Sequence, residues 1–288
     1  MMRVYANAKI NLALHVTGQR DDGYHLIDSL VTFANISDTL EISNSESMSL
    51  EIVGLDASGL PTNHDNLILK AVRLLGEHTG QNDLAARIRL TKNLPVASGI
   101  GGGSADAAAA LLALNGFWDL NLSSQELATI GLNLGADVPM CLMGEPLTAC
   151  GIGEVINAVD LPKFDIVLVN QRMHVSTPEV FGRLKRKDHP SLPAVPATMN
   201  FHQCIAWLAD TRNDLERPAL GCCPQISNCL AALNNTGAKF ARMSGSGATC
   251  FGLFADQESA IAARDSISTQ YPDWWVATGR TIGAKNAD

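Results

Sequence analysis

One short stretch of the chain combines the residue types that hold a phosphate group. Four glycines fall within positions 99–103, and Ser104 and a run rich in alanine and leucine follow at once. Alanine and leucine are strong helix formers, so we expect a helix to begin near Ser104, with Ser104 or Asp106 in its first turn or at its cap. Glycines before a helix let backbone N–H groups approach a ligand, and the helix dipole adds positive potential there. The stretch therefore predicts a phosphate-binding loop.

The spacing of this glycine loop excludes two common phosphate-binding motifs. No Gly-Lys-Ser or Gly-Lys-Thr ends it, as a Walker loop requires. The order Gly99-x-Gly101-x-Gly103 also differs from the dinucleotide pattern, and no acidic residue stands at a strand end about twenty positions later. For the segment alone, a tight turn before a helix is the alternative interpretation.

The first element that could place a side chain beside this loop is a strand near the N-terminus. Its apolar residues recur at every second position, with polar or small residues between them, which is the period of a strand. Lys9 and Asn11 are therefore expected on one face, with Ile10 and Leu12 on the other.

Further strands and helices follow in irregular order. We expect a helix over residues 67–75 capped by Asn66 or Asp65, and a strand over 86–91 that enters the glycine loop. A capping box at residues 123–126 predicts a second helix ending at Leu134. Two paired strands, residues 240–243 and 249–254, flank a small-residue turn. The mixture indicates an α+β fold. We place a boundary near Leu161, which gives domains over residues 1–160 and 161–288.

Composition limits the partners and the compartment. A net charge of −8 argues against a protein that coats nucleic acid, because the phosphate backbone would be repelled. The seven cysteines are odd in number and form no Cys-x-x-Cys, which disfavours structural zinc and a disulfide framework and favours the reducing cytoplasm. The chain shows no apolar signal segment and no run of membrane-spanning length, so we expect a cytoplasmic protein without a membrane partner. We expect a monomer or a weak homodimer.

Three segments together resemble the signatures of the GHMP kinase superfamily, and they occur in the same order. They are residues 8–12, the glycine loop, and residues 243–248. The runs Gly-Gln-Arg-Asp-Asp-Gly-Tyr-His at 18–25 and Leu-Gly-Ala-Asp-Val-Pro at 134–139 resemble one branch of that superfamily more closely. Members of this branch phosphorylate the 2-hydroxyl of a small-molecule substrate, CDP-methylerythritol, on the route to isoprenoid precursors. The resemblance covers nearly the whole chain and is strongest over the first 155 residues.

The resemblance implies a two-domain α+β fold and the cofactors ATP and Mg²⁺. The expected domains are an N-terminal one of the ribosomal protein S5 domain 2-like type and a ferredoxin-like C-terminal one. Asp137 is implied as the general base that removes the hydroxyl proton, although the following Pro139 also suits a helix N-cap at Asp137, and the two roles can coexist. Lys9 is implied as its partner, because an ammonium there would favour the ionised carboxylate and stabilise charge on the transferring group.

The implied nucleotide loop spans residues 96–106. Its members are Val96, Ala97, Ser98, Gly99, Ile100, Gly101, Gly102, Gly103, Ser104, Ala105 and Asp106. Ser104 would bind Mg²⁺, contact a phosphate oxygen, or simply cap the helix; the metal ligands themselves stay unknown. Asn66 and residues 92–94 would line the adenine side.

For the second substrate, the resemblance implies that Tyr24 and Phe181 enclose the cytosine ring and that His25 reads its polar edge. Asn11 would hold a substrate hydroxyl. The chain departs from some relatives at Val31, where an aromatic residue is expected, so this side of the pocket would be wider. The competing functions are a GHMP kinase of another alcohol, such as homoserine or mevalonate, and a nucleotide-binding sensor without catalysis.

Overall fold

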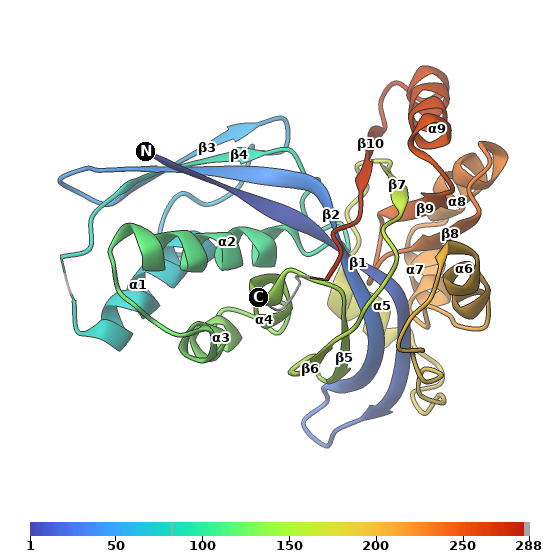
Figure 1. Ribbon diagram of the computed structural model, residues 1–288, viewed down its shortest axis with the longest axis horizontal. Helices are drawn as coiled ribbons and strands as arrows, with labels where there is room; N and C mark the ends of the chain where they lie inside the picture. The colour runs from blue at the N-terminus through green and yellow to red at the C-terminus, as the bar shows by residue number, and fades with distance from the viewer. Residues whose placement is uncertain (82, 285–288) are drawn as a thin grey trace. The chain divides into compact units, whose positions relative to one another are not determined.

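The computed structural model describes residues 1–81 and 83–284. The strands are β1 (Met2–Gln19), β2 (His25–Ser43), β3 (Ser49–Gly54), β4 (Arg87–Lys92), β5 (Leu147–Gly151), β6 (Val155–Ala158), β7 (Asp165–Asn170), β8 (Phe240–Met243), β9 (Cys250–Phe254) and β10 (Trp275–Arg280). The helices are α1 (Leu67–Thr79), α2 (Gly102–Phe117), α3 (Ser124–Leu132), α4 (Val138–Met143), α5 (Thr177–Gly182), α6 (Phe201–Ala209), α7 (Glu216–Cys222), α8 (Ile226–Asn235) and α9 (Gln257–Gln270). Strands and helices alternate irregularly, as expected for an α+β fold (Figure 1).

These elements form two compact units that are interleaved along the chain. Unit 1 contains Met1–Ala8, Ser37–Val96 and Gly101–Met143. Unit 2 contains Lys9–Ile36, Ala97–Ile100 and the described residues from Gly144 onward. β1 and β2, which pair with each other, contribute residues to both units. The division of the chain at residues 160 and 161 stays a prediction.

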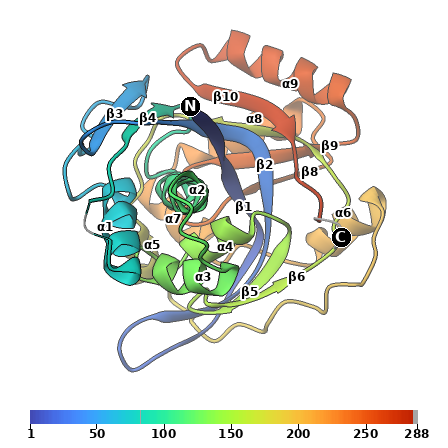
Figure 2. The same cartoon turned by 60° about the vertical axis from the view of Figure 1, so that its left-hand side comes forward.

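In unit 1, helices pack beside a small group of strands. β4 pairs antiparallel with the second half of β2, from Thr39↔Thr91 to Ser43↔Arg87, and parallel with β3. α2 packs against α1, α3 and α4 (Figure 2). The apolar core of this unit includes Leu40, Ile88 and Leu111. Alanines fill much of the buried surface of α2, so its neighbours approach closely.

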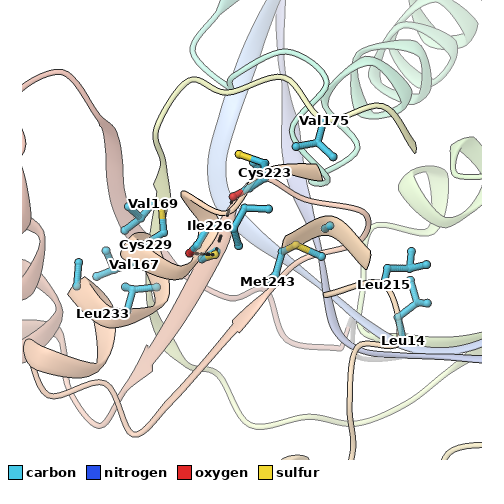
Figure 3. Packing of buried hydrophobic residues seen from close by; sticks show 14 of the residues in the cluster. Leu14, Val167, Val169, Val175, Leu215, Cys223, Ile226, Cys229, Leu233 and Met243 are labelled. Carbon is cyan, nitrogen blue, oxygen red and sulfur yellow. Dashed lines mark hydrogen bonds between the residues drawn. The ribbon is translucent and has the colours of Figure 1, made fainter. Parts of the chain in front are cut away.

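In unit 2, a four-stranded antiparallel sheet has the order β10-β7-β9-β8, and α8 and α9 pack on it (Figure 1). The first half of β2 pairs antiparallel with β5, which pairs with β6. The core of this unit combines β7 residues such as Val167 with Leu233 of α8 and Met243 of β8 (Figure 3). Leu14 of β1 joins the same cluster.

Several local predictions are confirmed with shifted ends. The structure begins α2 at Gly102 rather than Ser104, and its cap residue is Gly101. Of the two predicted places for Ser104, the first turn is confirmed, because Ser104 is the third residue of α2, and the cap is wrong. Asp106 is the fifth residue of the helix, beyond both predicted places. α3 has the predicted capping box but ends at Leu132 instead of Leu134. β1 is buried on both faces from Ala8 to Val16, whereas its alternation predicts one polar face.

Among the described residues, the structure contains no helix that is both long enough and apolar enough to pass through a lipid bilayer.

Candidate active site

The glycine loop begins where β4 ends, in unit 1. The carboxylate of Asp38 accepts hydrogen bonds from the backbone N–H groups of Asn93, at 2.6 Å, and Leu94, at 2.9 Å. The Asn93 side chain donates to the carbonyl of Ser37 at 2.9 Å. The chain that leaves β4 is thereby fixed before it reaches the glycines, and Val96 is exposed beyond this point.

The middle of the loop, Ala97–Ile100, belongs to unit 2 and packs against the small-residue turn after β8. The Thr249 N–H donates to the Ser98 carbonyl at 3.0 Å, and the Ser244 hydroxyl donates to the Gly99 carbonyl at 3.0 Å. Gly99 has a φ of +78°, and a Cβ built there would lie 2.7 Å from the Gly247 nitrogen. Only glycine fits this position without displacing the turn.

The end of the loop opens α2 in unit 1. Gly101 caps the helix at a φ of +65° and makes no side-chain cap hydrogen bond. The first turn therefore presents backbone N–H groups that no capping side chain satisfies, and it carries no acidic residue. Ser104 is half-buried in this turn. This is the arrangement that favours an anionic ligand at the start of a helix.

A buried ion cluster lies beneath this helix start. Lys92, the last residue of β4, contacts the carboxylates of Asp38 and Asp106, the latter at 2.8 Å. Burial raises the pKa of Asp106 to about 7; Lys92 opposes this shift, and the Asp38 carboxylate adds to it. The pKa of Lys92 is raised: burial acts to lower it, but the two carboxylates outweigh that effect. Asp38 was not predicted from the sequence, where its only signal was a charged residue at an inward position of an apolar strand.

Lys9 and Asn11 lie on β1 in unit 2, and both side chains are buried. The side-chain amide of Asn11 donates to the Ser29 hydroxyl at 2.8 Å, and its backbone N–H donates to the Ser244 hydroxyl at 3.1 Å. The Asn11 Oδ1 is buried without a hydrogen-bond partner. The backbone N–H of Lys9 donates to the carbonyl of Ile100 at 3.0 Å, which joins β1 to the glycine loop. An unmatched acceptor beside the loop suits a hydroxyl donor.

Asp137 lies in unit 1, immediately before α4, and is half-buried. The backbone carbonyl of Asp137 accepts the first hydrogen bond of this helix, from the Cys141 N–H at 3.1 Å. Asp137 therefore occupies the cap position that the sequence allows. α4 packs against α2 and α3 of the same unit. A carboxylate at the start of a helix is favoured by the helix dipole.

His25 and Phe181 meet in unit 2, with ring centroids 4.8 Å apart and planes inclined by 32°. The His25 Nε2 is buried without a hydrogen-bond partner. Burial, and to a smaller extent Lys187, lower the pKa of His25, so its ring is neutral near pH 7. Tyr24 is largely exposed. The structure thus brings two of the three predicted pyrimidine contacts together, with the buried Nε2 of one of them lacking a hydrogen-bond partner.

Of the remaining residues in the predicted segments, Asn66 and Gly245 have close local neighbours. Asn66 caps α1 by accepting from the Ile68 N–H at 2.9 Å and donates to the Pro61 carbonyl at 2.8 Å. Gly245 has a φ of +55°, and a Cβ there would lie 2.7 Å from the Gly99 carbonyl oxygen. Ala105 is buried in α2, whereas Ala97 and Gly103 are exposed.

Comparison with known proteins shows the family of the chain. The model of the GHMP kinases N terminal domain matches residues 66–145, and that of the GHMP kinases C terminal domain matches residues 194–273. A Ruegeria pomeroyi protein named 4-diphosphocytidyl-2-C-methyl-D-erythritol kinase is 52% identical over 98% of this chain and 99% of its own length. A protein of the same name from Cereibacter sphaeroides is 50% identical over 98% of this chain and 100% of its own length.

Solved structures extend the comparison. A crystal structure of 4-(cytidine 5′-diphospho)-2C-methyl-D-erythritol kinase matches with a TM-score of 0.80 at 30% identity, over 98% of this chain and 100% of the other. Homoserine kinase from Cytophaga hutchinsonii matches with a TM-score of 0.67 at 17% identity, over 98% of this chain and 94% of the other, and shares the fold.

Proposed function

The chain belongs to the 4-diphosphocytidyl-2-C-methyl-D-erythritol kinases of the GHMP superfamily, and we propose that it transfers the γ-phosphoryl group of ATP to the 2-hydroxyl of that cytidine substrate. The products are the 2-phosphate and ADP, in the synthesis of isoprenoid precursors. The observation that carries the choice of substrate is the His25–Phe181 pair with its unpartnered Nε2, because homoserine and mevalonate have no ring for the pair to recognise.

The residues of the glycine loop are proposed to bind ATP. The first-turn N–H groups of α2 would donate to the phosphate oxygens, and the absence of an acidic residue in that turn supports this role. The Ser104 hydroxyl is the proposed protein contact to Mg²⁺, which neutralises charge on the phosphates when it is bound. No group of three or more His, Cys, Asp or Glu side chains suited to a metal occurs in the described part of the chain. The ion would therefore be held mainly by the nucleotide.

Asp137 and Lys9 are the proposed catalytic residues. Asp137 would accept the proton of the 2-hydroxyl while the hydroxyl oxygen attacks the γ-phosphorus and ADP departs. Lys9 would stabilise the charge of the transferring phosphoryl group. Asn11 would accept a hydrogen bond from a substrate hydroxyl, which its unpartnered Oδ1 supports.

We also propose a cytoplasmic enzyme that is a monomer or a weak homodimer. None of the seven cysteines, all of which lie in the described part of the chain, forms a disulfide, which fits a reducing compartment. ATP as phosphoryl donor fits the same compartment.

An ADP-release assay with three alcohols tests the proposed function. Purified protein with ATP and Mg²⁺ should release ADP with the cytidine substrate and not with homoserine or mevalonate. Turnover of homoserine or mevalonate instead would contradict the choice of substrate. Binding of ATP without turnover of any of the three would favour a nucleotide sensor.

Phe181→Ala should raise the KM for the cytidine substrate about 5- to 150-fold, because loss of base–aromatic stacking costs ~1–3 kcal/mol. The KM for ATP should stay unchanged. Steady-state kinetics with each substrate varied in turn would measure both. Phe240→Ala is a matched control, because Phe240 is also a half-buried aromatic residue of unit 2. An unchanged KM for the cytidine substrate in Phe181→Ala would remove this residue from the pocket.

Lys9→Met should lower kcat by about 10²- to 10³-fold, the usual effect of removing one group that stabilises transition-state charge. Methionine keeps most of the buried apolar stem and removes only the ammonium. Lys239→Met, at an exposed position of unit 2, serves as the control. Single-turnover kinetics would measure the chemical step, and an unchanged rate for Lys9→Met would rule out the proposed charge role.

A further inference from the structure

The proposed site includes Asp106 in the nucleotide loop and residues 92–94 on its adenine side, but it assigns no task to the buried contacts among the Lys92, Asp38 and Asp106 side chains. We propose that these three side chains are positioning residues that hold both ends of the glycine loop and so fix the first turn of α2 for the nucleotide. This inference rests on the proposed nucleotide site, and it concerns how that site is held rather than which alcohol is phosphorylated. All three residues belong to unit 1.

The entry of the loop is held through Asp38. One oxygen of its carboxylate contacts the Lys92 ammonium, and the other accepts the N–H groups of Asn93 and Leu94, at 2.6 Å and 2.9 Å. Three donors therefore converge on one buried carboxylate. Hydrogen bonds to an ionised acceptor are shorter and stronger than neutral ones, so the chain that leaves β4 has little freedom.

The exit of the loop is held through Asp106 of α2. The same Lys92 ammonium donates to its Oδ2 at 2.8 Å. The start of the helix is also close, because a Cβ built on Gly102 would lie 3.5 Å from the Lys92 Nζ. One ammonium thus links the strand that enters the loop to the helix that leaves it, and the spacing of these two ends is set before nucleotide binds.

The energetics of Asp106 favour a positioning role over a contribution to stability. Its Oδ1 is buried without a hydrogen-bond partner, and its second oxygen shares Lys92 with Asp38. Burial raises its pKa to about 7. With Asp106 replaced by a neutral residue, Lys92 and Asp38 still form a balanced pair, so no unpaired charge is left behind. The Asp106 carboxylate is therefore dispensable for folding.

The test compares Asp106→Ala and Asp106→Asn with the wild-type protein, using calorimetric titration with the non-hydrolysable ATP analogue AMP-PNP and Mg²⁺. Asp106→Ala should bind AMP-PNP about 10- to 100-fold more weakly, the usual consequence of a small displacement of binding groups. Its unfolding midpoint without nucleotide should equal or exceed that of the wild type. Asp106→Asn should restore most of the affinity, because its amide oxygen can still accept from Lys92.

A further measurement separates positioning from stability. In turnover, Asp106→Ala should raise the KM for ATP more than it lowers kcat.

Equal AMP-PNP affinities in the wild type and Asp106→Ala would overturn the inference. A loss of affinity that is accompanied by a lower unfolding midpoint would overturn it too, because the role would then be structural. A wild-type protein that binds AMP-PNP but phosphorylates no alcohol would refute the proposed function alone. The positioning role would still be decided by the ratio of the AMP-PNP affinities of the wild type and Asp106→Ala.

Discussion

Asp137→Asn is expected to lower kcat by about 10²- to 10⁴-fold, the usual contribution of a positioned general base. The amide that replaces the carboxylate cannot accept the hydroxyl proton. Asparagine is as good a helix cap as aspartate, so the start of α4 should be preserved. Burst-phase or single-turnover measurements of ADP release would isolate the chemical step, and the affinity for AMP-PNP should remain close to that of the wild type.

The same substitution separates the two roles that the sequence allows for Asp137. If the residue only caps α4, Asp137→Asn keeps nearly full activity, and the proposed base would then be wrong. Asp256→Asn is a suitable control, because Asp256 caps α9 by accepting the Ser259 N–H at 2.8 Å and has no proposed role in the reaction. Both variants should unfold at the wild-type midpoint.

Gly99→Ala is expected to lower the free energy of unfolding by about 3 kcal/mol and to abolish most nucleotide binding. A non-glycine residue at positive φ costs ~1–2 kcal/mol. The new methyl group must also displace the Ser244 carbonyl and the Gly247 nitrogen, and such overpacking costs ~1–3 kcal/mol. Urea unfolding followed by circular dichroism would give the first quantity, and titration with AMP-PNP the second.

Gly237→Ala is the matched control for this effect. Gly237 has a comparable φ of +90°, but a Cβ there would meet nothing within 4 Å. Its substitution should cost only the backbone contribution of ~1–2 kcal/mol and leave AMP-PNP binding intact. Equal losses in the free energy of unfolding for Gly99→Ala and Gly237→Ala would show that the close approach of the Ser244–Gly247 turn to Gly99 does not make the substitution more costly.

The parts of the site that could be predicted from sequence depend on local physical chemistry. Glycines before a run of helix formers predicted the loop and α2, and the capping box at Ser123 predicted the start of α3. The exact start of α2 was displaced because Gly101 caps it through its left-handed backbone rather than through a side chain. Side-chain rules therefore placed the cap at the wrong residues.

The buried ion cluster could not be predicted in this way, because its members are distant in the sequence. Asp38 precedes Lys92 by 54 positions, and Asp106 follows Lys92 by 14. Only the pairing of β2 with β4, and the packing of α2, bring them together. The two buried faces of β1 have a similar origin. Alternation indicated a polar face at Lys9 and Asn11, whereas tertiary contacts enclose both side chains.

The interleaving of the two units constrains the order in which the nascent polypeptide can fold during synthesis. All segments of unit 1 lie before residue 144, so this unit has every one of its strands and helices once Met143 has left the ribosome. Leu14 and Val16, in contrast, pack against residues such as Val169 and Leu215, which are translated much later. The later half of β1 must therefore wait with its apolar side chains uncovered, and we expect it to need chaperone protection during synthesis.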